Sequence, residues 1–151
     1  MSRNLGSRKL GTRAIPNLRF GLCCQFADAP IRIRTTTAAS LLRLSEDQRN
    51  QKLSNLCLAN AEALLAVLKF CAENDIGSFR IPSWILPVKT HPQVGYQISD
   101  LPESAKIISA FEHCGKFASE RGLRTTFHPD QFVVLNSPRT EVVANSLAEL
   151  E

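Results

Sequence analysis

Three times along this chain, a short segment that reads as a strand, the first of them mostly apolar, is followed by a longer segment whose apolar residues recur every three or four positions. Short apolar runs indicate buried strands, and the three- to four-residue spacing indicates amphipathic helices. Strands that alternate with helices in this way form parallel sheets through right-handed crossovers. The alternation therefore predicts an α/β fold with a parallel sheet.

The alternating segments have clear sequence boundaries. Ser45, followed three residues later by Gln48, resembles a capping box at the start of the first helix, and Asp75-Ile-Gly77 ends that helix. We predict strands at Phe20–Phe26, Ser78–Ile81 and Arg124–His128, and helices at about 45–74, 102–121 and 138–151.

The three strand–helix units do not make a closed domain. The chain of 151 residues stops at Leu147–Glu151 in the middle of a helical pattern, without the Gly, Asn or Pro that commonly follows a helix. Three units cannot close a barrel, which needs eight units and about 250 residues. We therefore expect the N-terminal part of a (β/α)8 TIM barrel, about three βα units long and incomplete.

Positive charge is concentrated at the start of the chain. Residues 1–34 hold seven basic residues against one acid, Asp28, although the whole chain has 18 basic and 14 acidic residues. We interpret residues 1–19 as a basic flexible leader and residues 20–151 as the barrel portion. A basic segment of this kind is suited to binding nucleic acid. A solvated tail and an Arg-rich transit peptide are the alternative interpretations.

The cysteines and the apolar runs indicate the compartment. The five cysteines form an odd set without a Cys-x-x-Cys pair, which is neither a disulfide framework nor a zinc motif. Free thiols are typical of a reducing compartment, so a cytoplasmic location is expected. The longest uncharged apolar run, Ala63–Leu68, is far shorter than the roughly 20 residues of a membrane span. We expect no membrane partner, and no obligate protein partner is indicated.

Candidate site residues lie where the predicted strands end. In a parallel α/β barrel the chemistry occurs at the carboxyl ends of the strands, here Cys24–Phe26, Arg80–His91 and His128–Asn136. His128 leaves a strand directly, and a strand-end imidazole suits a metal ligand or an acid–base group. His91 lies in the long loop after the second strand, where a surface histidine is the alternative interpretation.

An amide and an aromatic ring follow the strand-end histidine. Gln131 and Phe132 could replace a base in an opened duplex, the ring stacking and the amide forming hydrogen bonds. Alternatively, Phe132 begins an apolar run and packs inward. Arg32 and Arg34 alternate in the segment after the first strand and are candidates for contacts with phosphates.

Several of these segments together resemble a known family. Phe20–Phe26, Phe79–Ser83 with Thr90-His-Pro92, and above all Thr126–Pro138 are similar to the N-terminal part of the UV-damage endonucleases, over roughly residues 19–151. That family is related in fold to apurinic-site endonucleases and xylose isomerases. The resemblance implies a DNA-repair enzyme that nicks damaged double-stranded DNA 5′ to UV photoproducts. It also implies a divalent metal cluster, usually manganese, with magnesium or zinc as alternatives.

The resemblance assigns roles to individual residues. His128 matches a metal-binding histidine, and His91 matches a second histidine near the catalytic centre, a catalytic residue and metal ligand. Gln131 and Phe132 match the pair, commonly Gln-Tyr, that probes the lesion. The family's remaining histidine and acidic ligands lie beyond Glu151, so the 151-residue chain alone is expected to be inactive.

The chain also departs from the family pattern. Leu22 and Phe26 stand where many members carry Tyr and Asn, and Pro82 stands where Ser is common. Two other functions remain open on the residues alone: a non-catalytic DNA-binding remnant, and a sugar-isomerase-like barrel fragment with His128 as its acid–base group. The pair Gln131-Phe132 and the basic leader favour DNA over sugar.

Overall fold

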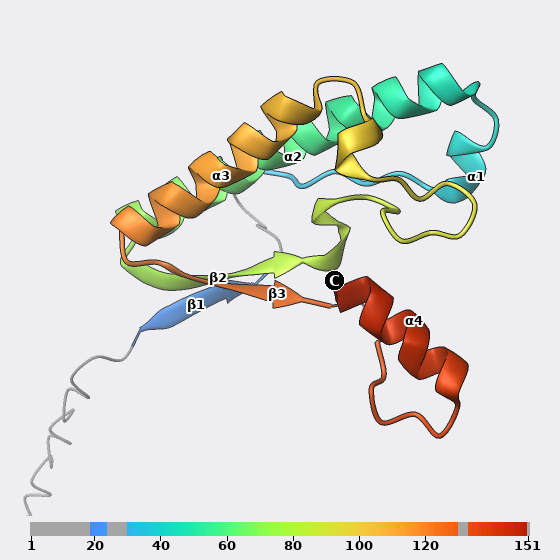
Figure 1. Ribbon diagram of the computed structural model, residues 1–151. Coiled ribbons are helices and arrows are strands. Elements are labelled where there is room, and N and C mark those ends of the chain that lie inside the picture. The colour runs from blue at the N-terminus through green and yellow to red at the C-terminus, as the bar shows by residue number, and fades with distance from the viewer. Residues whose placement is uncertain (1–18, 24–29, 130–132, 151) are drawn as a thin grey trace, which may run out of the picture.

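The computed structural model describes residues 19–23, 30–129 and 133–150. Strands β1 (Phe20–Cys23), β2 (Ile76–Pro82) and β3 (Arg124–His128) form one parallel sheet with β2 in the middle. Figure 1 shows the two long helices, α2 (Glu46–Glu73) and α3 (Ser104–Glu120), lying side by side over one face of this sheet. The predicted fold of three parallel strands with helices is confirmed, whereas closure of a barrel remains a prediction.

Helix α2 begins and ends where the sequence predicts. The capping box is present: the Gln48 backbone N–H donates to Ser45 Oγ (3.4 Å), and the Ser45 N–H donates to Gln48 Oε1 (3.2 Å). Asn74 caps the other end, and Asp75 adopts a left-handed conformation with φ 56° before the chain enters β2.

Shorter elements fill the connections between these strands and helices. The one-turn helix α1 (Ala38–Leu41), which the sequence analysis missed, precedes α2. The 3₁₀ turns η1 (Ser83–Ile85) and η2 (Ile98–Asp100) interrupt the long stretch after β2, and α4 (Thr140–Leu150) follows β3. The elements β3, α3 and α4 lie where they were predicted, within about two residues at each end.

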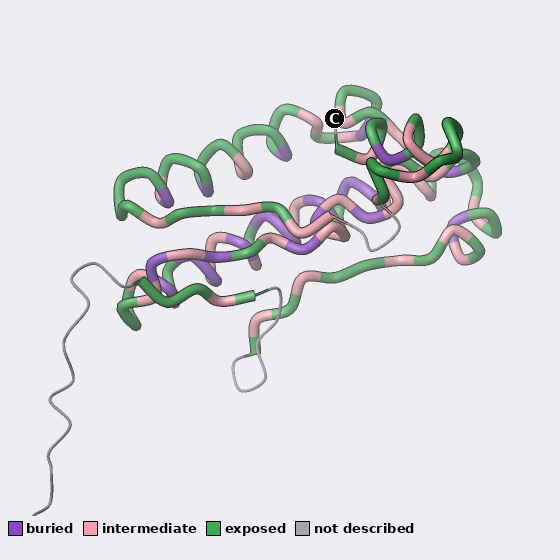
Figure 2. Tube along the Cα trace, turned by 90° about the horizontal axis from the view of Figure 1, so that it is seen from below, coloured by how far each residue is buried: buried purple, intermediate pink, exposed green. Residues whose placement is uncertain are grey.

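The buried residues form two clusters along α2. Figure 2 shows buried residues along α2 and on the side of α3 that faces α2. The first cluster joins the second half of α2 to β2 and α3, and consists of Leu64, Val67, Leu68, Cys71, Phe79, Ile85, Cys114 and Ala118. The second cluster joins the first half of α2 to the 86–101 stretch, and consists of Leu41, Leu53, Cys57, Val94, Leu101 and Ile107.

The two faces of the sheet differ in polarity. Phe79 is fully buried under the helices, and its register partners Leu22 and Thr125 share that face. The residues between them point to the face that α2 and α3 do not cover. That face carries Cys23, Ser78, Arg80, Arg124, Thr126 and His128.

The first strand is less buried than the sequence analysis expected. A run of apolar residues from Phe20 to Phe26 was predicted to be a buried strand, but Phe20 is 70% exposed and Leu22 alone among residues 20–23 packs against the core. The prediction of burial was wrong because β1 lies at the edge of the sheet. Residues 24–26 lie outside the described part of the chain.

One helix is long enough and apolar enough to cross a membrane. Within the described residues, α2 alone meets this test, by length and composition. The count of uninterrupted apolar residues did not detect it, because Asn60 and Glu62 interrupt the run. Core helices of globular proteins meet the same test, and α2 contributes its apolar residues to both core clusters.

Candidate functional site

The carboxyl ends of β2 and β3 lie at the same edge of the sheet. Pro82, the last residue of β2, is the register partner of His128, the last residue of β3. The η1 turn continues directly from β2, and α4 lies beyond the end of β3 (Figure 1). Of the described candidate residues, His128 and His91 therefore lie near this edge, as the arrangement of parallel strands predicts.

A cavity of about 840 Å³ opens at this edge between the 83–92 segment and α4. Its polar lining includes Ser83, Thr90, His91, Asn145 and Glu149, and apolar residues including Phe127 form the rest. A cavity of this size with an aromatic ring and a few polar groups can hold a group as large as a nucleotide.

Two sets of hydrogen bonds hold α4 against this cavity. The Thr90 hydroxyl donates to the Glu149 carboxylate, which joins the loop to the end of the helix. The buried Ser146 hydroxyl donates to the Val142 carbonyl (2.7 Å) and accepts from the Val134 N–H (2.9 Å). The second set fixes the chain that leaves β3 against α4.

The loop around His91 is tightly folded. The His91 N–H donates to the Val88 carbonyl (3.0 Å), and the Gly95 N–H donates to the His91 carbonyl (2.7 Å). A β-carbon at position 95 would lie 2.6 Å from that carbonyl oxygen, so only glycine fits. The backbone thus holds His91 half-buried in the cavity wall.

The hydrogen bonding of His91 determines which ring nitrogen faces a ligand. The Gln93 N–H donates to His91 Nδ1 (3.2 Å), so Nδ1 uses its lone pair there. In a neutral imidazole the proton is then on Nε2, which makes Nε2 a donor. In this arrangement His91 can donate a hydrogen bond to an anionic oxygen. Metal ligation through Nε2 would require the other tautomer and the loss of the Gln93 contact.

His128 occupies a different face of β3 from the cavity. It is half-buried and lies on the face that carries Arg80 and Thr126, whereas its neighbour Phe127 lines the cavity with His91. No group of three or more His, Cys, Asp or Glu side chains that could hold a metal ion occurs among the residues described. The two predicted histidines therefore share an edge of the sheet but do not by themselves form a metal centre.

Arg32 and Arg34 are both exposed, and the structure explains why. They alternate with Ile31 and Ile33, which pack against the first core cluster, so the arginines point outward. Asn60 fixes this segment: its Oδ1 accepts from the Arg34 N–H (2.7 Å), and its Nδ2 donates to the Arg34 carbonyl (2.9 Å). The predicted basic pair is thus presented to solvent.

Asn60 is a structural residue that the sequence analysis did not single out. It is fully buried and its Nδ2 also donates to the Ile85 carbonyl (2.9 Å). Asn60 therefore connects α2 both to η1 and to the segment that carries Arg32 and Arg34, called the arginine segment below. A polar residue within an otherwise apolar helical stripe was the available signal, because a buried amide needs partners.

We expect the change Asn60→Leu to destabilise the fold and to loosen the arginine segment. The change leaves the Ile85 carbonyl, at a buried contact, and the Arg34 N–H and carbonyl, at part-buried contacts, without their partner; an unsatisfied buried group costs about 1–3 kcal/mol, and the part-buried groups can recover hydrogen bonds from water. The melting temperature should fall by roughly 5–15 °C. Thermal melts monitored by circular dichroism measure it, and Asn136→Leu, at an exposed position outside the helices and strands, is the control.

The predicted residues Gln131 and Phe132 lie outside the described part of the chain, and so does Cys24. Their predicted roles therefore stay predictions.

Among the described residues three cysteines are buried, and burial changes their acidity. Desolvation raises the pKa of the Cys57, Cys71 and Cys114 thiols above the ordinary value of 9.0. Burial likewise raises the pKa of Tyr96, whose hydroxyl lies 3.3 Å from Cys57 Sγ. These thiols are free and stay protonated near neutral pH.

The raised pKa values predict a loss of stability in alkali. A group whose pKa is higher in the folded state stabilises the fold fully below its unfolded pKa, and this contribution is lost as pH rises above about 9. Each thiol that ionises only on unfolding lowers the unfolding free energy by about 1.4 kcal/mol per pH unit. Urea denaturation at pH 7.5 and pH 10 tests this. Cys23→Ser, at an exposed position, should leave the alkaline loss unchanged.

The sequence pattern of the family described as "UV-endonuclease UvdE" matches residues 18–151. The chain belongs to this family. It is 34% identical over 144 residues to the UV DNA damage endonuclease of Nostoc sp. (strain PCC 7120 / SAG 25.82 / UTEX 2576). The matched segment covers 95% of this chain and 42% of that relative. The UV DNA damage endonuclease of Bacillus mycoides (strain KBAB4) is 27% identical over 117 residues, which covers 78% of the chain and 35% of that protein.

Part of a solved structure has the same fold as this chain. The crystal structure of SacUVDE matches with a TM-score of 0.71 and 30% identity, over 88% of this chain and 42% of the other. The chain thus spans less than half the length of the relatives it matches. The predicted resemblance to UV-damage endonucleases is confirmed.

Proposed function

We propose that this chain contributes the N-terminal part of a metal-dependent endonuclease that nicks double-stranded DNA 5′ to UV photoproducts. The observation that carries the proposal is the family match over residues 18–151, which includes the segment from His128 to Pro138. In the proposal the three βα units belong to a (β/α)8 barrel, and the protein acts in the cytoplasm.

The metal centre in this proposal depends on ligands that the described residues do not supply. Manganese and magnesium prefer carboxylate oxygens, whereas imidazole nitrogens suit zinc. His128 and His91 are the two imidazoles at the edge of the sheet, and they do not form a complete site among the residues described. We assign the carboxylate ligands to the portion of the longer relatives that this chain does not span.

The residues of this chain have separate roles in the proposed function. His128 supplies one metal ligand from the end of β3. His91, with its proton on Nε2, donates a hydrogen bond to a phosphate oxygen in the cavity. Arg32 and Arg34 contact phosphates of the DNA backbone, and Gln131 with Phe132 probes the damaged step.

A chimeric protein tests the proposal. The chain is joined to the part of the Nostoc relative that it does not cover, and the product is incubated with UV-irradiated and unirradiated supercoiled plasmid in the presence of Mn²⁺. We expect the chimera to nick irradiated plasmid preferentially, and the 151-residue chain alone to leave both plasmids intact. A folded chimera that binds Mn²⁺ but nicks neither plasmid would contradict the proposal.

A further inference from the structure

We propose that a groove along the first half of α2 is a second DNA contact, which holds backbone phosphates independently of the cavity at the sheet edge. The inference rests on the proposed function because it takes DNA as the ligand. It adds residues that neither the sequence analysis nor the site at the sheet edge assigned, above all Lys52.

The groove is shallow, has a volume of about 450 Å³ and is mostly apolar inside, and cationic and amide groups belong to the residues that border it. Two cationic side chains and three side-chain amides form its walls, small and apolar residues form the remainder, and no carboxylate is included. The lining residues are Arg34, Gln48, Gln51, Lys52, Asn55, Leu56 and Ala59. Cations and amides are the side chains that most often contact DNA phosphates.

Two separate elements form the groove. Residues three and four positions apart share a helix face, so Gln48, Lys52 and Asn55 lie in one row on α2. Arg34 comes from the extended segment before α1, and Asn60 holds its backbone through hydrogen bonds of 2.7 and 2.9 Å. The arginine is therefore fixed beside the helix by a buried amide.

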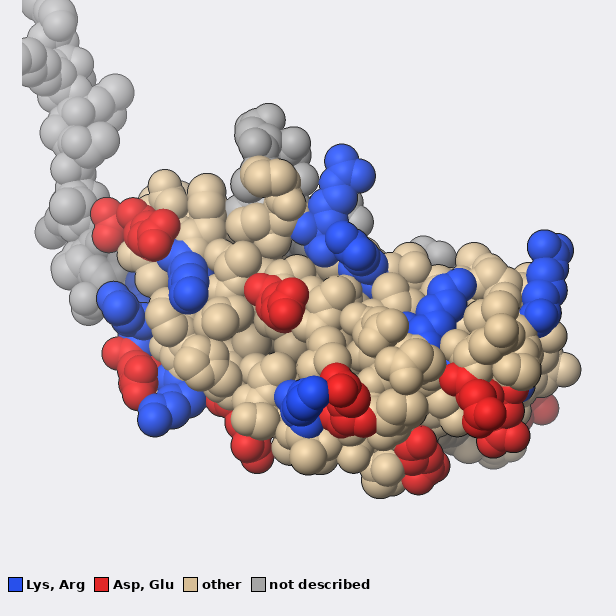
Figure 3. Space-filling model, turned by 90° about the horizontal axis from the view of Figure 1, so that it is seen from above, with Lys and Arg blue, Asp and Glu red and all other residues tan. Residues whose placement is uncertain are grey.

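The cations of the groove are free to bind an anion. Within the described chain, ion pairs occupy Lys106, Lys116 and Arg139, whereas Arg34 and Lys52 take part in none. Basic and acidic side chains are also separated on part of the helical side of the molecule, whereas they alternate on the rest of it. In the right half of Figure 3, Lys and Arg lie along the upper margin and Asp and Glu along the lower one.

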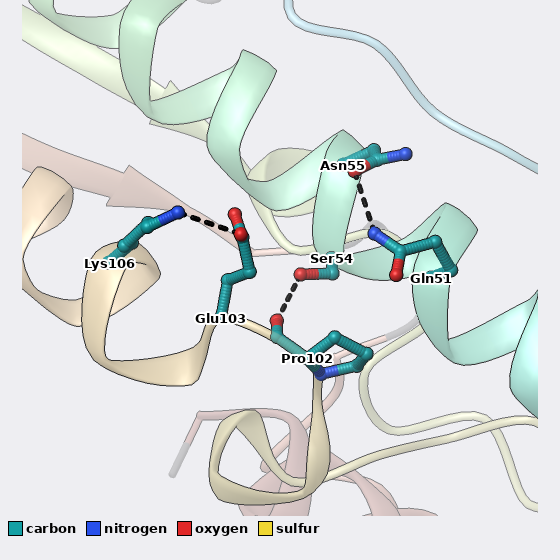
Figure 4. Close-up of polar contacts among 6 residues, drawn as sticks. All are labelled: Gln51, Ser54, Asn55, Pro102, Glu103 and Lys106. Carbon is teal, nitrogen blue, oxygen red and sulfur yellow. Dashed lines mark hydrogen bonds and ion pairs between the residues drawn. The ribbon is translucent and has the colours of Figure 1, made fainter.

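The amides of the groove keep donors for a ligand. Gln51 Nε2 donates to Asn55 Oδ1 (3.1 Å), which orients both side chains, and Figure 4 shows the Asn55 nitrogen directed away from this bond. On another side of α2 the Ser54 hydroxyl donates to the Pro102 carbonyl at the start of α3 (Figure 4). The row of amides is thus turned away from α3 and remains open.

The shape and chemistry of the groove favour a nucleic-acid backbone over a small anion. From Gln48 to Ala59 the helix spans about 16 Å, which is long enough for several phosphates of one DNA strand, spaced about 3.4 Å apart along the duplex axis. Acidic Asp47 and Glu62 lie just outside the lining, so the part of α2 that attracts phosphates is limited to the groove itself. No aromatic ring lines it, so it cannot stack on bases or detect a lesion.

A salt series on the 151-residue chain tests this inference. Affinity for an undamaged 20-base-pair duplex is measured for the unchanged chain, for Lys52→Ala, and for Arg34→Ala combined with Lys52→Ala. Each lost phosphate contact should reduce the slope of log K against log salt by about 0.9, so the double variant should lose about 1.8. At 0.1 M salt this corresponds to a 10- to 60-fold loss of affinity.

A matched control separates the groove from general charge. Arg43→Ala combined with Lys69→Ala removes the same charge from exposed positions, one just before α2 and one on it, outside the groove. We expect less than a threefold loss and a slope change below about 0.5 for this control. Equal losses in the two double variants, or no binding of duplex by the folded chain, would overturn the inference.

The damaged duplex provides the last comparison. The groove variant should lose the same factor on irradiated and unirradiated DNA, because backbone phosphates are common to both. A lower ratio of damaged to undamaged binding would show that the groove reads the lesion, which contradicts a backbone site. The chimera assay decides the proposed function separately, since nicking can fail while duplex binding by the groove persists.

Discussion

Replacing His128 by alanine in the chimera is expected to lower the nicking rate on irradiated plasmid at least 100-fold. Changes to residues that only support a metal ligand cost 10- to 100-fold in affinity or activity, and the loss of a ligand should cost more. Because His128 is the last residue of β3 and lies opposite Pro82, the change removes an imidazole from the edge without disturbing the buried core. The number of Mn²⁺ ions bound per protein should fall with the rate.

The matched control for this prediction is His113→Ala. His113 is exposed on α3, which covers the face of the sheet opposite to His128, and its loss should leave both nicking and Mn²⁺ binding unchanged. If His128→Ala retains full Mn²⁺ stoichiometry and nicks at the unchanged rate, His128 is not a ligand. Reduced nicking with full stoichiometry would instead make it an acid–base or positioning residue.

Local sequence signals predict most of the fold correctly. The capping box at Ser45 and the turn at Asp75 depend only on neighbouring residues, so the bounds of α2 follow from the sequence. Strand β3 was also located correctly, because Gly122 and Pro129 enclose a short segment in which β-branched and aromatic residues predominate. The parallel order of the strands follows from the alternation with helices.

Burial of the first strand could not be predicted in the same way. An apolar run reads the same at the edge of a sheet as at its centre, and the position of β1 depends on which strands pair with it. Gly21 and Cys23 belong to the face that the helices do not cover, so only Leu22 reaches the core. The assignment of strands to positions in a sheet is tertiary information.

The candidate site shows the same division between local and long-range information. The sequence places His128 at a strand end and His91 in a loop, and the structure agrees with both positions. The contact of Thr90 with Glu149 joins residues 59 positions apart, and no local pattern indicates it. The tautomer of His91 likewise does not follow from the sequence. It depends on the hydrogen bond that the Gln93 N–H donates to His91, which forms only when the loop is folded.

Removing the side chains of Gln131 and Phe132 together in the chimera is expected to reduce the preference for damaged DNA. A photoproduct weakens stacking and pairing, so a damaged step opens at the lowest cost, a few kcal/mol at most. A ring inserted into the gap recovers about 1–3 kcal/mol of stacking, and the amide can pair with an exposed base edge. This gain is larger at damage than on sound duplex, which makes the pair a discriminator.

The measurement is the ratio of affinities for irradiated and unirradiated duplex across a salt series. Gln131→Ala with Phe132→Ala should lower this ratio by about 5- to 150-fold, the equivalent of 1–3 kcal/mol, and should leave the salt slope nearly unchanged. Arg32→Ala is the contrasting variant, because a lost phosphate contact weakens both complexes equally and reduces the slope. An equal loss of affinity for both DNAs in the Gln131 and Phe132 variant would favour the alternative interpretation, in which Phe132 packs in the core. Discrimination would then have to come from the cavity beside Phe127, whose ring is 44% exposed at the same edge of the sheet.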